Sequence, residues 1–363
     1  MTDKQLNMDK RDDDSIRYLN RDEKERTKRL WESCFAEDSN EFVSYYYKEK
    51  IQQNRILVKL DGNDVITMLH RNPYQVRMRK KHWNVDYIVG VATRYDRRKK
   101  GYMEKVLITC LNDMNREHMP FTFLMPVSEA IYYPYSFRFV EWEKCFSLNQ
   151  TENPDRKEVL ENEYECTMAS EWMMKWIKSQ YEMSTVRDSE YVKRLIQELK
   201  SEQGKLEFLL DRGNIVGLQA FWGMKQREQR LLYIGKEWCE QKERKPRIMA
   251  RITDVMTFLP EFCLMQPGTL RVELKLKDEQ IEQQNSVFFW KITEQGSEIK
   301  KGNQKEKKQS DDTIVLNATI GEITEWLFGV RTPKDIWREQ KSDEIDRLNK
   351  IRTLKTIFFD EIV

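Results

Sequence analysis

The stretch over residues 87–104 constrains the fold of this chain more than any other part of the sequence. A short apolar run over 87–92 leads into a basic stretch that ends at Gly101, and an amphipathic pattern follows over 101–115. This order predicts a buried strand, a tight basic loop and a helix. A helix N-terminus offers unpaired N–H groups and the positive end of its dipole, and Gly101 has no Cβ to keep a ligand away. The sequence therefore predicts a pyrophosphate site at the start of this helix.

The composition limits the class of protein. The chain has 363 residues, more than one domain usually holds, so we expect two or three domains. Charged residues make up 34% of the sequence, but the formal net charge is only +2, which argues against a nucleic-acid partner. The six cysteines and three histidines lack zinc-ligand spacing, so we expect no metal. A polar N-terminus without any apolar run of about 20 residues predicts a cytoplasmic protein with no membrane span.

The first 148 residues are expected to form one mixed α/β domain. Apolar periodicity predicts two short helices, then four strands, a long helix and further strands. Residues 61–63, Asp-Gly-Asn between two strand-like runs, are typical of a hairpin turn. The predicted helices cover 22–35, 40–47, 101–115 and 128–133, and the predicted strands cover 55–60, 65–69, 74–78, 85–93, 121–125 and 137–142.

Two further domains are expected over 149–246 and 247–363, after a polar linker at 150–156. A charged break at 237–246 is expected to end the central domain, and a lysine-rich loop at 298–312 is expected to interrupt the last one. The predicted helices are 188–199, 255–259, 320–328 and 343–351, and the predicted strands are 205–210, 215–222, 229–234, 269–276, 286–293 and 313–318.

The chain ends in the apolar sequence TIFFDEIV. Most chain ends are polar and frayed, so this composition predicts that the terminal residue, Val363, is buried in a specific place. Asp360 and Glu361 are expected to form a solvated turn, although two carboxylates there could also attract a cationic substrate.

Residues 98–103 read RKKGYM and resemble the Arg/Gln-x-x-Gly-x-Gly/Ala pattern of the GNAT acetyltransferases, with Met103 in place of the final small residue. Four further stretches resemble one subfamily, the enhanced intracellular survival (Eis) group. They are LWESCFAED at 30–38, YYYKEK at 45–50, VAT at 91–93 and SEAIYYPYSFRFV at 128–140. The resemblance covers essentially the whole chain. It implies a catalytic GNAT domain, a reduced central GNAT-like domain that binds no CoA, and a C-terminal α+β domain similar to sterol carrier proteins.

The resemblance implies that acetyl-CoA is the acyl donor and that an amine accepts the acetyl group. A strand can pair its backbone with the pantetheine amides, the following loop can hold the pyrophosphate, and the next short helix approaches the same cofactor. The residues implied in these three roles are Val91, Ala92 and Thr93, then Arg98, Lys99, Lys100, Gly101, Tyr102, Met103 and Glu104, and then Ser128 and Glu129.

The same resemblance implies the two proton-transfer groups. It assigns the general acid to Tyr132, and a shift of one residue in the match would assign it to Tyr133. It assigns the general base to the α-carboxylate of Val363, which is ionised at neutral pH because its ordinary pKa is about 3.5. The amine would attack the thioester directly, without an acyl-enzyme, which fits cysteines that lie beside no histidine.

The acceptor is left open among an aminoglycoside-like amine, a polyamine-like amine and lysine. The resemblance implies a homo-oligomer, a hexamer. A different hypothesis is a non-catalytic lipid- or peptide-binding carrier with a vestigial CoA site. A weaker one is nucleic-acid binding through residues 94–100 and 300–308. The plain alternatives for the site are a solvated basic helix start, tyrosines that only pack, and a chain end whose carboxylate is idle.

Overall fold

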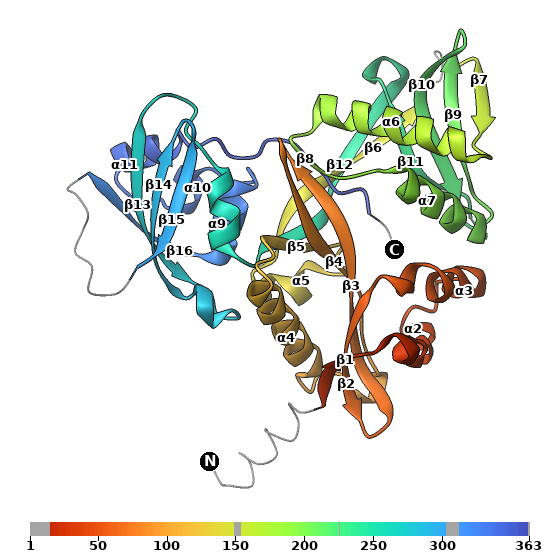
Figure 1. Ribbon diagram of the computed structural model, residues 1–363, viewed down its shortest axis with the longest axis horizontal. Helices are drawn as coiled ribbons and strands as arrows, with labels where there is room; N and C mark the ends of the chain where they lie inside the picture. Colours follow the sequence, from red (N-terminus) through yellow and green to blue (C-terminus); the bar gives the residue numbers. More distant parts are fainter. Residues whose placement is uncertain (1–14, 149–153, 225, 303–311, 362–363) are drawn as a thin grey trace. The chain divides into compact units, whose positions relative to one another are not determined.

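The computed structural model describes residues 15–148, 154–224, 226–302 and 312–361 (Figure 1). These residues form two compact units, and the chain passes between them several times. The first unit comprises Met1–Arg77, Val89–Val106 and Glu143–Lys245, and the second comprises Met78–Ile88, Leu107–Trp142 and Pro246–Val363.

The amino-terminal part of the first unit is a sheet in the order β1-β2-β3-β4. Strands β2 and β3 form the predicted hairpin, and Gly62 takes φ +58 in its turn. The expected separate strand at 74–78 is the end of the long strand β3, and β1 was not predicted. The elements here are β1 (Ile16–Tyr18), η1 (Arg21–Thr27), α2 (Lys28–Cys34), α3 (Asn40–Lys48), η2 (Lys50–Gln52), β2 (Arg55–Asp61), β3 (Asp64–Met78) and β4 (Lys81–Thr93).

The central part of the first unit is an antiparallel sheet, β11-β10-β9-β7, against which helices α6 and α7 pack (Figure 1). Strands β9, β10 and β11 and helix α7 were predicted, whereas α6, β7 and β8 were not. The bounds are β7 (Arg156–Val159), α6 (Glu163–Gln180), β8 (Met183–Thr185), α7 (Ser189–Ser201), β9 (Lys205–Asp211), β10 (Asn214–Trp222) and β11 (Glu228–Ile234).

In the second unit the strand order is β4-β5-β12-β6. Strand β5 runs parallel to β4, which it pairs at Tyr87 and Phe123, and antiparallel to β12. The expected charged break at 237–246 is wrong, because β12 begins at Cys239 and runs through this stretch. The elements are α4 (Tyr102–Arg116), β5 (Phe121–Leu124), α5 (Glu129–Tyr132), η4 (Tyr133–Tyr135), β6 (Arg138–Leu148), η5 (Lys236–Trp238) and β12 (Cys239–Ile252), of which α4, β6 and β12 contribute residues to both units.

The rest of the second unit is a four-stranded sheet, β15-β14-β13-β16, in which β13 and β16 are parallel. Alternate side chains of β13 are buried, so one face of this sheet forms a core. Strand β15 occupies the first part of the expected lysine-rich loop, and 303–311 lie outside the described residues. The bounds are α8 (Val255–Phe258), η6 (Leu259–Glu261), β13 (Thr269–Lys277), η7 (Glu282–Gln284), β14 (Ser286–Thr293), β15 (Gly296–Lys301), β16 (Thr313–Thr319), α9 (Ile320–Leu327), α10 (Pro333–Ile336), α11 (Ser342–Leu348) and β17 (Ile357–Phe358). The expected mixed α/β class is confirmed.

Candidate functional site

Strand β4 is bent just before the predicted cofactor residues. Gly90 takes φ +60, which lies in the left-handed region that residues with a Cβ rarely adopt. A Cβ on Gly90 would also lie 2.5 Å from Cζ3 of Trp31 and 3.4 Å from Cγ of His70. Glycine is therefore required here by both conformation and space, and it allows the local kink from which residues 91–93 continue.

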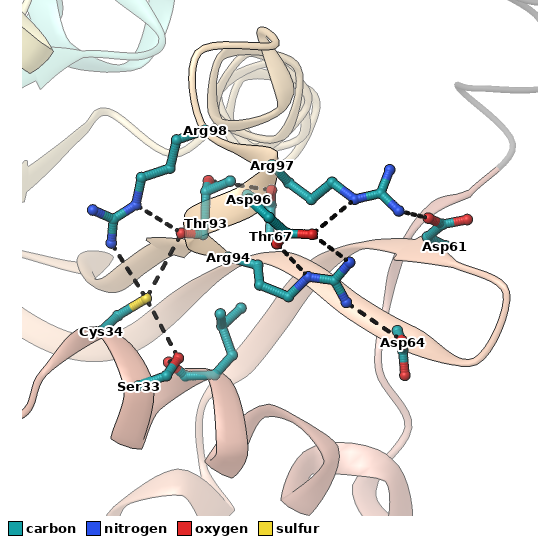
Figure 2. A network of polar contacts seen from close by, with 11 residues as sticks. Ser33, Cys34, Asp61, Asp64, Thr67, Thr93, Arg94, Asp96, Arg97 and Arg98 are labelled. Atoms are coloured by element: carbon teal, nitrogen blue, oxygen red, sulfur yellow. Dashed lines mark hydrogen bonds and ion pairs between the residues drawn. The ribbon is translucent and has the colours of Figure 1, made fainter.

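The end of β4 is fixed by hydrogen bonds from three directions (Figure 2). The N–H of Arg94 donates to the Ile66 carbonyl at 2.9 Å, and the hydroxyls of Thr67 and Thr93 lie 3.2 Å apart. Arg98 folds back, so that its Nε donates to the Thr93 carbonyl at 3.1 Å and its Nη2 lies 3.7 Å from Sγ of Cys34. The Thr93 carbonyl is thus already engaged by protein groups.

Two of the arginines in the basic run are neutralised by carboxylates (Figure 2). Arg94 contacts Asp96 at 2.8 Å and Asp64 at 3.4 Å, and Arg97 contacts Asp61 at 2.5 Å. The hydrogen bond from Arg94 holds the pKa of the Asp96 carboxyl below its ordinary value, so this acid stays ionised. The uncompensated charge of the loop therefore resides mainly on its later members, Arg98, Lys99 and Lys100, which are all exposed.

The loop reaches α4 through two residues in the left-handed region, Lys99 at φ +60 and Gly101 at φ +76. The first hydrogen bond of the helix joins the Lys105 N–H to the Gly101 carbonyl at 3.1 Å. The N–H groups of residues 102–104 therefore precede the helical ladder, and left-handed turns of this kind form concave N–H sites for anions. Tyr102 and Met103 are half-buried, Glu104 is exposed, and Nζ of Lys59 lies 5.8 Å from the centre of the Tyr102 ring.

The two adjacent tyrosines of the predicted acid differ in environment. Tyr132, on α5, is 8% exposed, and burial raises the pKa of its phenol to about 12. Its ring packs edge-on against Phe137, with centroids 5.9 Å apart. Tyr133 is 47% exposed, and the guanidinium of Arg138 lies 3.7 Å from its ring centre. One of the two candidate tyrosines is therefore buried and the other is exposed.

The residues that flank this tyrosine follow from the local backbone. Ser128 precedes α5 and Glu129 begins it, and both side chains are exposed. Ser136 takes φ +65 at the end of η4, in the left-handed region that most often holds glycine.

The end of the chain is buried as far as it is described. The Phe359 ring stacks on the Phe123 ring with centroids 4.6 Å apart. The backbone N–H of Phe359 donates to Oε2 of Glu141 at 2.7 Å. Asp360 pairs with Nη2 of Arg247 at 3.0 Å. The expected solvated turn at Asp360 and Glu361 is wrong, because both residues are buried. Val363 itself lies outside the described residues.

Tyr87 connects the predicted acid with the chain end. Its ring lies 5.1 Å from that of Phe123, and the residue is almost fully buried. Burial raises the pKa of Tyr87. The charge of Glu361 and the phenol of Tyr132 also raise this pKa, whereas the charge of Arg247 lowers it. Glu361, Arg247 and Tyr132 therefore each lie within electrostatic reach of Tyr87 in the second unit.

The sequence prediction of the site is thus divided between the two units. The cofactor residues 91–93 and 98–104 belong to the first unit, whereas Ser128, Glu129 and Tyr132 belong to the second. Sequence reasoning missed Tyr87, Glu141 and Arg247, which come from three different strands, β4, β6 and β12.

Neither metal ligation nor membrane insertion has support in the described part of the chain. Over those residues, His, Cys, Asp and Glu form no group of three or more that could hold a metal ion. In the same ranges, every helix is too short or too polar to cross a bilayer.

The sequence over residues 15–140 matches the family model of the acetyltransferase (GNAT) domain. These residues form a GNAT acetyltransferase domain. The match includes the strand–loop–helix of β4 and α4 as well as Tyr132. No curated protein matches the chain in sequence.

Solved structures share the fold along nearly the whole chain. A protein from Enterococcus faecalis, described as a probable N-acyltransferase, gives a TM-score of 0.76 at 14% identity, over 94% of this chain and 98% of that one. A GCN5-related N-acetyltransferase from Anabaena variabilis gives a TM-score of 0.71 at 12% identity, over 96% of this chain and 100% of that one. Eis1 from Mycobacterium abscessus gives a TM-score of 0.69 at 9% identity, over 96% of this chain and 100% of that one. At such identities the likeness concerns the fold alone, and the similarity of the last domain to sterol carrier proteins stays a prediction.

Proposed function

We propose that this protein transfers the acetyl group of acetyl-CoA directly to an amine. The observation that carries the proposal is the coincidence of the GNAT domain match with the left-handed turn at Gly101, which opens the N-terminus of α4 after a bent strand. A basic loop with this backbone fits a pyrophosphate, because its N–H groups and lysines are all donors.

The donor is bound by the backbone more than by side chains. N–H groups of residues 99–104 hold the pyrophosphate, and Lys99 and Lys100 supply charge. Arg98 supports the site by tying the loop to the Thr93 carbonyl. Because that carbonyl is engaged, the pantetheine amides pair chiefly with Val91 and Ala92. Ser128 and Glu129 line the route to the thioester, and the half-buried Met103 packs beneath the loop.

Tyr132 supplies the proton for the leaving group. The amine nitrogen attacks the thioester carbon, a C–N bond forms, and the C–S bond breaks. The departing thiolate takes the phenolic proton of Tyr132, whose raised pKa of about 12 keeps it protonated at neutral pH. The proton lost by the amine passes to the base and restores the phenol, so the products are an amide and free CoA.

The base is the α-carboxylate of Val363. Its position is supported by Glu361, which is buried within electrostatic reach of Tyr87, as is Tyr132. At most about 7 Å of chain separates Val363 from Glu361. A terminal carboxylate would receive an amine that enters as an ammonium ion, which fits an acceptor of the aminoglycoside, polyamine or lysine class. The hexamer rests on the resemblance alone, and the cytoplasmic location rests on the composition of the sequence.

The proposal is tested by CoA thiol release from acetyl-CoA with a panel of these amines, paired with mass spectrometry of each amine. We expect thiol release that depends on the amine and matches the acetylated product. A variant with one residue added after Val363 should bind acetyl-CoA normally and turn over slowly. Full activity of that variant would exclude the terminal base. Thermal stabilisation by fatty acid but not by acetyl-CoA would exclude the enzyme in favour of the carrier.

A further inference from the structure

The last described residues of the chain are held by contacts from three different strands. Phe123 of β5 stacks on Phe359, Glu141 of β6 accepts the Phe359 N–H, and Arg247 of β12 pairs with Asp360. We call Phe123, Glu141 and Arg247 the C-terminal anchor. The three contacts fix a ring, a backbone N–H and a side chain, so together they determine the position and the direction of the chain.

The polar contacts of the anchor are buried, and their geometry is more specific than packing alone requires. The side chains of Arg247 and Asp360 are 12% and 7% exposed, and Glu141 is 7% exposed as a residue. A buried ion pair often contributes little net stability, because desolvation offsets the attraction, whereas its geometry is specific. A chain end that only had to pack could do so with its apolar residues.

The last residue held by the C-terminal anchor is Asp360, which directly precedes Glu361. Tyr87 contacts Phe123 of the anchor, and the electrostatic fields of Glu361, Arg247 and Tyr132 all reach Tyr87. Any shift of Asp360 would therefore be passed along a short backbone to the terminal carboxylate. The two groups that transfer protons would then lose their common geometry.

We propose that Arg247 and Glu141 are positioning residues, which hold Phe359 and Asp360 and thereby set where the chain end lies in the proposed reaction. This inference rests on the proposed function, because it assigns a purpose to the terminus. Their effect is confined to where the chain end lies, which gives it a signature separate from cofactor binding.

The test compares Arg247→Met, which keeps the length of the side chain without its charge, with Arg247→Lys, which keeps the charge. Two readouts are used: steady-state kinetics with acetyl-CoA, and the rate at which carboxypeptidase removes the terminal residues of the native full chain, followed by mass spectrometry. Arg331→Met is the control for the loss of an ion pair, because Arg331 also pairs with a carboxylate, Glu325, at 3.1 Å.

We expect Arg247→Met to lower kcat roughly a hundredfold with little change in the KM for acetyl-CoA, since misplacement by about 1 Å has this effect. Carboxypeptidase should trim its chain end faster than that of the native chain, and Arg247→Lys should restore part of both properties. Arg331→Met should change neither. Wild-type kcat with a protected chain end in Arg247→Met would overturn the inference.

Two further measurements keep the outcomes distinct. If Arg247→Met does not fold, Asp360→Asn removes the same ion pair with a smaller change, and the same two readouts decide. If a residue added after Val363 abolishes turnover while Arg247→Met and Asp360→Asn behave as wild type, the anchor fails and the proposed function stands. If the added residue has no effect, the terminal base itself fails, and the anchor fails with it.

Discussion

The Phe359 ring stacks on the Phe123 ring with centroids 4.6 Å apart and planes inclined by 21°. Both residues are fully buried, and they join the end of the chain to β5 within one unit. The apolar composition of the terminus thus has a physical cause. Phe359 is part of a core, and Phe123, on which it stacks, also contacts the ring of Tyr87.

Removal of this stack should destabilise the protein. Phe359→Ala leaves a cavity against Phe123, and we expect the free energy of unfolding to fall by about 3–5 kcal/mol. Denaturant unfolding measures this change. Tyr95→Ala removes an aromatic ring that is 84% exposed and should stay within about 0.5 kcal/mol of wild type. Equal stabilities of the two variants would mean that the chain end does not pack as described.

The turn at Gly101 permits a matched pair of variants. Gly101 and Gly62 both have positive φ, at +76 and +58, and an added Cβ meets no close atom at either position. Substitution by alanine at either position should therefore lower the free energy of unfolding by about 1–2 kcal/mol, because the backbone is strained there. Only Gly101→Ala should weaken acetyl-CoA binding in calorimetry, because only there does a ligand approach the backbone. Similar affinities in both variants would count against the pyrophosphate site.

His70 should make the stability depend on pH. Its ring is buried beside Trp31, its Nδ1 lies 2.9 Å from the hydroxyl of Tyr46, and burial lowers its pKa to about 3. In the unfolded chain the pKa is near 6.5. Between these values the unfolded state binds one more proton, so the free energy of unfolding decreases as the pH falls through this window, by up to about 1.4 kcal/mol per unit.

Unfolding titrations from pH 6.5 down to about 4 test this dependence. His70→Gln should lose this part of the slope, whatever its absolute stability. His82→Gln replaces an exposed ring and should retain the full slope. An unchanged slope in His70→Gln would show that His70 is protonated in the folded protein as readily as in the unfolded one.

Local chemistry explains what the sequence could predict. The strand, basic loop and helix of 87–115 are contiguous, so their periodicity and Gly101 were sufficient to place the predicted cofactor segment on β4 and α4. Helix α6 was missed although Asn162 and Glu165 form a capping box at its start. Its buried side chains include Cys166, Ala169 and Met173, which give a weak apolar signal.

Tertiary pairing explains what the sequence could not predict. Strand β12 carries a charged first half and a proline, both unfavourable locally, yet residues 249–252 pair with β5 from a distant part of the chain. The burial of Asp360 follows in the same way, because its partner Arg247 lies on β12. A charged residue gives no sign in its own neighbourhood that a distant strand will supply its counter-ion.

The central claim is that Tyr132 protonates the leaving group in acetyl transfer, and a pair of conservative variants tests it most directly. Tyr132→Phe and Tyr133→Phe each remove one hydroxyl from adjacent positions, and turnover of acetyl-CoA with the best amine is measured for both. We expect Tyr132→Phe to lose about a hundredfold or more in kcat, with unchanged acetyl-CoA binding, and Tyr133→Phe to remain near wild type. Equal turnover in wild type and Tyr132→Phe would contradict the account.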